Sequence, residues 1–207
     1  MKTKIYFFLS VFVLLGNACT TSTETEMEEN PSKKYTLTAF EPSASFPDAK
    51  IKEYNYENGV FTYDVENYNL GEQTPDANLK MCANSGSGQH IHLIIDTLPY
   101  IAKYEAEFDQ TVEPGEHYML SFLSRSYHES IKTPNAFKAE KVTISDNGTF
   151  ETRQDIGEPI LFYSRPKGTY VGEQQTNKVM LDFYLLNTTL GEDLKVEALI
   201  NGESHII

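Results

Sequence analysis

The stretch Ser87-Gly-Gln-His-Ile-His-Leu-Ile-Ile-Asp96 decides the predicted fold of this chain. Its first residues alternate apolar side chains with histidines, which indicates a β-strand, because successive side chains of a strand point to opposite faces. Ile91, Leu93 and Ile95 then share one face, which we expect in a hydrophobic core. The opposite face carries both histidines, and we expect it to meet solvent, a partner or a bound ligand.

Similar short strands are expected from residue 34 to the C-terminus. They are rich in Tyr, Phe, Val, Ile and Thr and are separated by turns that contain Gly, Pro, Asn or Asp. The expected strands include residues 60–65, 117–123, 142–144, 149–152, 160–163, 179–186 and 194–200. Residues 100–108 are the one helix candidate. This pattern predicts an all-β fold, an antiparallel sandwich of immunoglobulin-like type, although the chain has no Trp for the core of a true immunoglobulin domain.

A short internal repeat suggests two related β-units. Asn67-Tyr-Asn-Leu-Gly-Glu72 returns as Asn187-Thr-Thr-Leu-Gly-Glu192, each time after an aromatic-rich strand. The predicted units are residues 36–133 and 134–207. The second unit ends before any counterpart of the strand at 117–123, so we expect it to expose a strand edge at which a protein partner could bind.

The N-terminus has the pattern of an export signal. A basic start and the apolar run 5–15 precede small residues and Cys19, which predicts a signal peptide over residues 1–18. The arrangement resembles the lipobox of bacterial lipoproteins, which implies lipidation of Cys19, a membrane anchor through that lipid, and an outer-membrane protein that faces the periplasm or the cell surface. Residues 19–35 are polar, as a disordered tether should be. The alternative is an ordinary secretory signal in which this Cys is incidental.

Charge and cysteine content exclude several classes of protein. The net charge of −13 argues against binding to nucleic acid, because phosphates require a basic surface, and against adhesion to anionic lipid. Cys82 is the one cysteine besides Cys19, so no internal disulfide is expected. A buried, inert thiol is the commoner interpretation of such a residue.

Histidines supply the strongest candidate site. His90 and His92 lie two residues apart on the predicted strand, so both imidazoles can reach one metal ion. His128, in the loop after the strand at 117–123, is the best candidate for a third ligand. The predicted cofactor is a divalent metal or copper. The alternative is a pair of histidines on a wet strand face without any metal.

Two resemblances include the histidine region. The first resemblance rests on residues 88–96, the segment Glu113-Pro-Gly-Glu-His-Tyr-Met-Leu120 and His128. Together they are similar to a small extracytoplasmic bacterial domain of unknown function with a Gly-His-His-His-Leu-Leu-Ile-Asp core. The chain from Cys19 onward also resembles lipoproteins sometimes labelled phosphopeptide-binding. That resemblance implies phosphate contacts from a Ser-Arg-Ser loop, whose candidate residues are Ser124, Arg125 and Ser126.

No hydrolase motif supports an enzyme. Ser85-Gly-Ser-Gly88 lacks the spacing of Gly-x-Ser-x-Gly and is not placed between a strand and a helix. We therefore expect a binding or assembly protein without catalytic residues. Three alternatives stay open: a metal-binding module, an interaction protein whose histidines only line a strand, and a phosphopeptide- or peptide-binding module.

Overall fold

The computed structural model describes residues 35–207, so the predicted signal peptide (1–18), Cys19 and nearly all of the tether (19–35) lie outside the described residues. Residues 39–207 form one compact unit of antiparallel strands arranged in several sheets. The predicted all-β class is confirmed, and the arrangement is consistent with a sandwich. No helix of the described residues has the length and hydrophobicity needed to cross a membrane.

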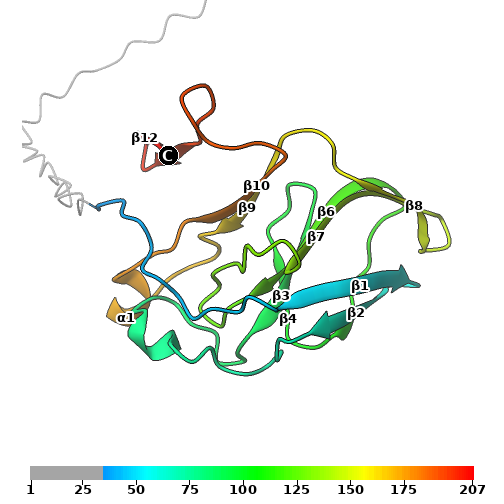
Figure 1. Ribbon diagram of the computed structural model, residues 1–207, viewed down its shortest axis with the longest axis horizontal. Helices are drawn as coiled ribbons and strands as arrows, with labels where there is room; N and C mark the ends of the chain where they lie inside the picture. Colours follow the sequence, from blue (N-terminus) through cyan, green and yellow to red (C-terminus); the bar gives the residue numbers. More distant parts are fainter. Residues whose placement is uncertain (1–34) are drawn as a thin grey trace, which may run out of the picture. The chain divides into compact units, whose positions relative to one another are not determined.

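A five-stranded antiparallel sheet forms the centre of this unit, in the order β4-β3-β6-β7-β8 (Figure 1). Its strands are β3 (His90–Ile95), β4 (Ile101–Lys103), β6 (Gly115–Ser124), β7 (Phe137–Ile144) and β8 (Phe150–Asp155). The predicted organising strand is β3, which pairs with β4 on one side and with β6 on the other. All six of its residues are buried. β3 is thus an inner strand of the sheet.

A three-stranded sheet, β1-β2-β5, packs on one face of the central sheet. Its strands are β1 (Lys50–Glu57), β2 (Val60–Glu66) and β5 (Glu107–Asp109). Ile91, Leu93 and Ile95 point into the core between the two sheets, as their alternation predicted. Tyr54 and Tyr63 line the same core from the smaller sheet, with their rings stacked and their centroids 5.3 Å apart.

A two-stranded antiparallel sheet covers the opposite face of the central sheet. Its strands are β9 (Ile160–Arg165) and β10 (Asp182–Leu186). Phe162 and Tyr184 pack there in one apolar cluster with Phe122 of β6. His90 and His92 point to this covered face and are 0% exposed. The interpretation of a wet strand face is therefore wrong, because β9 and β10 form a further layer above it.

The central sheet continues across the predicted boundary between units 36–133 and 134–207. β7, which follows that boundary, pairs with β6 over eight residue positions. The repeated hexapeptide has a local explanation instead. Asn67 and Asn187 follow the ends of β2 and β10 with φ of 56° and 58°, a conformation that Asn tolerates better than most residues. Each side-chain amide also donates a hydrogen bond to a backbone carbonyl, so the repeat marks two similar strand ends.

The helix candidate at residues 100–108 is wrong. This segment forms β4 and β5, which belong to different sheets. β4 extends the central sheet beside β3, and that pairing outweighs any local helical preference. The described helices are a 3-10 turn at Ala77–Leu79 and the four-residue α1 (Glu173–Thr176).

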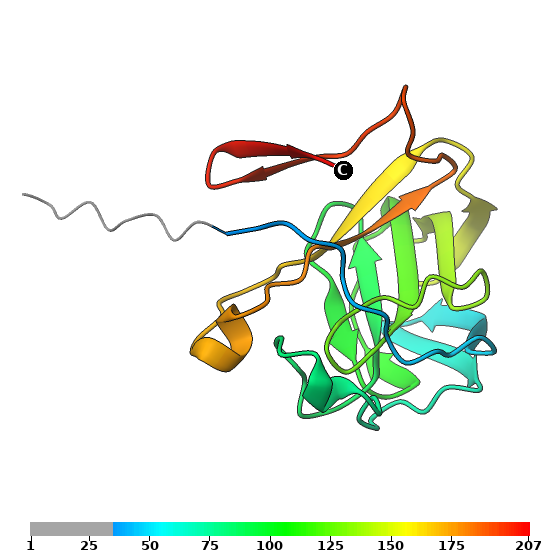
Figure 2. The ribbon, with the colours of Figure 1, turned by 60° about the vertical axis from the view of Figure 1, so that its left-hand side comes forward.

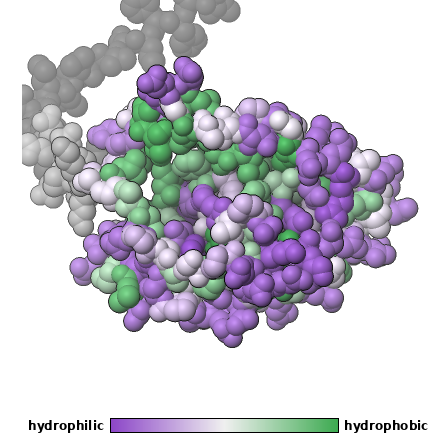
Figure 3. Space-filling view, viewed as in Figure 1, coloured by the Kyte–Doolittle hydropathy of each residue, from purple (hydrophilic) through white to green (hydrophobic). Residues whose placement is uncertain are grey.

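The last two strands form a separate hairpin, β11 (Glu197–Ile200) with β12 (Glu203–Ile206). Figure 2 shows it in red as a two-stranded ribbon that joins no other sheet of the described residues. Leu199 and Ile206 are 71% and 59% exposed. Hydrophobic residues also gather in the upper part of Figure 3, where β9, β10 and the C-terminal hairpin lie. The protein partner expected at this end of the chain stays a prediction.

Candidate metal centre

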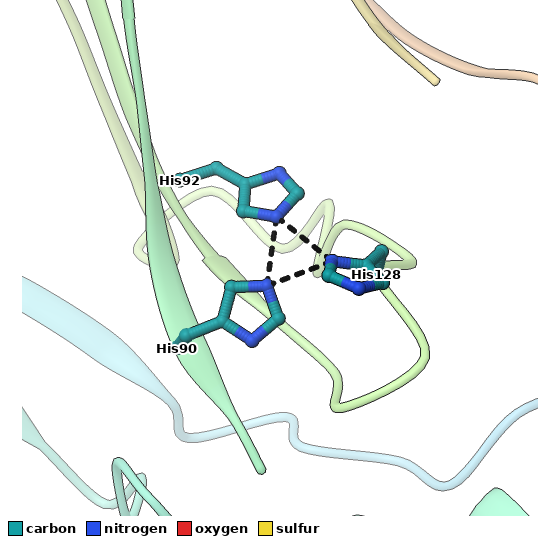
Figure 4. A group of neighbouring side chains, drawn as sticks. All are labelled: His90, His92 and His128. Carbon is teal, nitrogen blue, oxygen red and sulfur yellow. Dashed lines mark hydrogen bonds between the residues drawn. The ribbon is translucent and has the colours of Figure 1, made fainter. Parts of the chain in front are cut away.

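Three histidines from two elements converge inside residues 39–207 (Figure 4). His90 and His92 come from β3, and His128 comes from the loop after β6. The Nε2 atoms of His90 and His92 are 2.8 Å apart. Nδ1 of His128 lies 3.1 Å from Nε2 of His90 and 3.4 Å from Nε2 of His92. The structure thus brings together the three residues that the sequence predicted as metal ligands.

A tight turn aims His128 at the strand. Its backbone N–H donates to the carbonyl of Arg125 over 2.8 Å, and its φ is 68°. A positive φ costs a non-glycine residue about 1 kcal/mol, so the surrounding contacts must hold it. Ser126 and Thr74 provide such contacts, since each backbone N–H donates to the other's hydroxyl, at 2.8 and 3.2 Å. The loop is thereby tied to the segment before β3.

The start of β3 sets the orientation of His90. Nδ1 of His90 lies 2.7 Å from the carbonyl oxygen of Gly88. A carbonyl can only accept, so Nδ1 carries the proton and Nε2 presents its lone pair to the cluster. Gly88 has a φ of 87°, and a Cβ at this position would lie 2.5 Å from the carbonyl oxygen of Glu72. Only glycine fits this close approach of two backbone segments.

Burial keeps all three histidines neutral. It lowers the pKa of His90 to about 4, and the positive charge of Arg165 adds to that effect. Burial also lowers the pKa of His128 to about 3, with further contributions from His90, Arg165 and Lys167. The pKa of His92 falls well below its usual value, again chiefly through burial. Neutral imidazole is the form that binds metal, so the cluster needs no proton loss at neutral pH.

Aromatic rings line the cluster. Tyr100 stacks on His92 with ring centroids 3.7 Å apart and an interplanar angle of 11°. Phe122 meets His92 edge-on at 4.9 Å, and Tyr104 lies 4.9 Å from the ring of His90. These contacts fix the imidazole planes and keep water away from them.

Two cations next to the cluster were not predicted from the sequence. Arg165, which is 4% exposed, donates from Nη1 to the hydroxyl of Tyr100 over 2.7 Å. Lys167 donates to the backbone carbonyl of Tyr100, and its Nζ lies 4.4 Å from the centroid of that ring. The sequence signal was the segment Ser164-Arg-Pro-Lys167, a pair of cations after a strand in an acidic chain. Its distance along the chain from the histidines hid the connection.

The Ser-Arg-Ser loop is engaged inside the protein. Ser124 and Ser126 are 0% exposed, and Arg125 is 9% exposed. Arg125 donates to the carbonyl of Ala44 from Nε and Nη2, at 3.0 and 2.7 Å, and forms a salt bridge with Glu129 at 3.2 Å. Phosphate contacts from this loop would require these bonds to break. In the folded protein the loop positions His128.

The remaining candidate residues lie outside the cluster. Cys82 is buried beside Tyr127 and Met180, and burial raises the pKa of its thiol, in keeping with an inert residue. His117 bonds Asp96 at 2.8 Å and so anchors the start of β6. His205 lies in the C-terminal hairpin. None of these residues belongs to the three-histidine group found among the described residues.

The spacing of the three nitrogens is close to that of a ligand set. Zinc–nitrogen bonds of about 2.0–2.1 Å in a tetrahedron place nitrogens about 3.3 Å apart. The observed separations are 2.8, 3.1 and 3.4 Å. Three ligands of this kind would leave at least one coordination position open, as in metal sites that bind a further molecule. Hydrogen bonds among the three rings would also account for these separations, because a neutral imidazole can donate as well as accept.

In comparisons with known proteins, no family model, no curated protein and no solved structure matches the chain.

Proposed function

We propose that this protein binds one divalent transition-metal ion through His90, His92 and His128. The observation that supports this function is the convergence of three imidazole nitrogens within 3.4 Å of one another. Imidazole suits Zn²⁺, Cu²⁺, Ni²⁺ and Fe²⁺, and among divalent ions Cu²⁺ binds such sites most tightly. The proposed role is binding. From the leader pattern of residues 1–19 we expect the protein outside the cytoplasm.

The surroundings of the histidines favour metal binding as well. The Gly88 carbonyl holds His90 with its lone pair toward the cluster, which is how backbone acceptors commonly orient metal-binding histidines. The depressed pKa values of about 4 and about 3 for His90 and His128 mean that protons do not compete for the site at neutral pH.

Metal analysis of the purified protein tests this function. The apoprotein is incubated with Zn²⁺ or Cu²⁺, freed of excess ion, and analysed for metal per chain. We expect one ion per chain in the native protein and almost none in His92→Ala. His128→Asn should lose the ion too, and it keeps a residue that tolerates positive φ.

His205→Ala serves as the matched control, because it also removes an imidazole but lies outside the cluster. It should retain the ion. Circular dichroism of each variant checks that the β-sheets are intact. A native protein that takes up no ion in stoichiometric amount would show that the three histidines form only a hydrogen-bonded group, and the proposal would be abandoned.

A further inference from the structure

Arg165 is a buried cation without a counter-charge. It is 4% exposed, and its Nε is buried without a hydrogen-bond partner. Among residues 35–207, no carboxylate lies within ion-pair distance of Arg165 or of Lys167. Buried charges in proteins are normally paired, because an unpaired one loses its hydration without compensation. Arg165 is therefore a candidate group for binding an anion.

Asp182 is one candidate for a counter-charge among the described residues, since it lies opposite Arg165 in the β9–β10 register. Its Oδ1 instead lies 2.6 Å from Nζ of Lys132 and accepts from the hydroxyl of Ser130 at 2.7 Å. Lys132 thus already pairs with Asp182 through Oδ1, while Oδ2 of Asp182 is buried without a hydrogen-bond partner and forms no ion pair with Arg165.

Both cations lie one aromatic ring away from the histidines. The Tyr100 ring stacks on His92, and its hydroxyl accepts a hydrogen bond from Arg165. Nζ of Lys167 lies 4.4 Å from the centroid of the same ring. Ser164, next to Arg165 in the chain, places its hydroxyl 3.5 Å from Nδ1 of His92. A divalent ion at the histidines would add two positive charges beside these two, and no carboxylate of the described residues joins the histidine group.

We propose that the metal ion at the three histidines takes a small oxyanion as a further ligand, held by Arg165 and Lys167. This inference rests on the proposed metal site. Nη1 of Arg165 donates to Tyr100, whereas Nε, at the other edge of the guanidinium, is buried without a hydrogen-bond partner. That edge of a guanidinium binds carboxylate or phosphate side-on through two parallel hydrogen bonds. The ligand class is thus a carboxylate or a phosphate-type anion.

Lys167 lies at the surface end of this pair. It is exposed and lines a groove of about 360 Å³, whose lining also includes Ser164 and Asp96 but neither Arg165 nor the histidines. Arg165 is buried, with its guanidinium at the hydroxyl of Tyr100. Two cations in this arrangement attract anions and raise their local concentration.

Anion titration of the cobalt-loaded protein tests the proposal, because the visible spectrum of Co²⁺ reports each change in its ligands. Acetate, inorganic phosphate and chloride are added separately. We expect acetate or phosphate to shift the spectrum at lower concentration than chloride, which cannot make two parallel hydrogen bonds. The oxyanion that binds more tightly identifies the source of the ligand as a carboxylate or a phosphate.

Arg165→Gln and Lys167→Gln should each raise the half-saturating concentration of that oxyanion about tenfold or more, as expected for the loss of a charged hydrogen bond. Lys178→Gln removes the same charge from an exposed salt bridge with Glu41 and should change nothing. Lys167→Gln is the safer variant, since it alters an exposed side chain and keeps the test valid if Arg165→Gln unfolds.

The outcomes separate the two proposals. If the native protein takes up no Co²⁺, the metal site itself is refuted before any anion is added. If Co²⁺ binds but Lys167→Gln and any folded Arg165→Gln respond like Lys178→Gln, the oxyanion proposal is overturned. Arg165 would then serve as a distant counter-ion of Asp182.

Discussion

At the scale of single residues, folding lowers the pKa of each histidine in the cluster. The folded-state pKa is about 4 for His90 and about 3 for His128, against 6.5 in an unfolded chain. Below pH 6.5 the unfolded chain therefore binds protons that the folded apoprotein refuses. Acid then favours unfolding, and the loss of stability extends from about pH 6.5 down to the folded-state pKa values.

This asymmetry predicts a pH dependence that one residue can reveal. Between pH 7 and pH 5, the protonation of His128 in the unfolded chain should remove roughly 2 kcal/mol of stability from the apoprotein. His128→Asn lacks this ionisation and should lose about that much less over the same interval. Urea unfolding of both proteins at the two pH values measures the difference. Equal losses would contradict the assigned burial of His128.

The sequence pointed to the three histidines of the cluster but not to the residues around them. The alternation of His90 and His92 predicted a shared face, and the placement of His128 after the neighbouring strand predicted a third ligand. Arg165 and Lys167 escaped prediction because they lie far along the chain and reach the histidines only through Tyr100. A side chain that acts through a ring from another element leaves no local pattern in a sequence.

At the scale of elements, the position of His90 depends on the residues just before β3. Gly71 donates from its N–H to the carbonyl of Gln89 over 2.8 Å, and Gln89 donates back to the carbonyl of Glu72 over 2.6 Å. These two hydrogen bonds hold the first copy of the hexapeptide, residues 67–72, against the residues just before His90. The hexapeptide therefore has a structural role at this position.

Gly88→Ala should disturb both the fold and the site. Its Cβ would meet the carbonyl oxygens of Glu72 and Gly71 at 2.5 and 2.6 Å, at a φ of 87°. We expect the free energy of unfolding to fall by about 2 kcal/mol or more. Metal affinity should fall too, because the Gly88 carbonyl orients His90.

Gly86→Ala is the control for this prediction. It lies in the same loop, and a Cβ there meets no atom within 4 Å. Its free energy of unfolding should stay within about 0.5 kcal/mol of the native value. Denaturant unfolding and metal titration of both variants provide the comparison, and equal behaviour would mean that the backbone contact at Gly88 is unimportant.

At the scale of the whole molecule, each face of the central sheet of the described domain carries a large apolar cluster. The cluster between the two larger sheets holds the fold. The second, beneath β9 and β10, lies on the same face as the histidines. Removing a little volume from each cluster should therefore have similar effects on stability but different effects on the metal.

Phe162→Leu and Phe61→Leu make that comparison with the same substitution. Phe162 is 2% exposed in the cluster under β9, and Phe61 is 0% exposed in the other. Each variant should lose about 1–2 kcal/mol of stability. Only Phe162→Leu should accelerate removal of the ion by a chelator, because it loosens the layer above the histidines. Equal rates in the two variants would show that this layer does not control access.

The sequence predicted the sheets better than the layers. Alternation in 91–95 and in the other expected strands identified an all-β chain, because it reports which face of a strand is apolar. It could not report that β9 and β10 cover the polar face, since His90 and His92 look equally suited to water. The central sheet also spans the predicted boundary at residues 133–134, because β6 pairs with β7 across it. Local sequence patterns do not encode such pairing between strands.

The positions of the three histidines along the chain give the proposed metal site a thermodynamic consequence. His90 and His128 lie 38 residues apart in the sequence, and the one cysteine of the described residues is free. An ion between them would act as a reversible cross-link in a domain that has no disulfide. By the chain-entropy relation for covalent cross-links, closing a loop of that length stabilises a fold by roughly 4 kcal/mol. Metal supply would then affect how long the protein resists proteases.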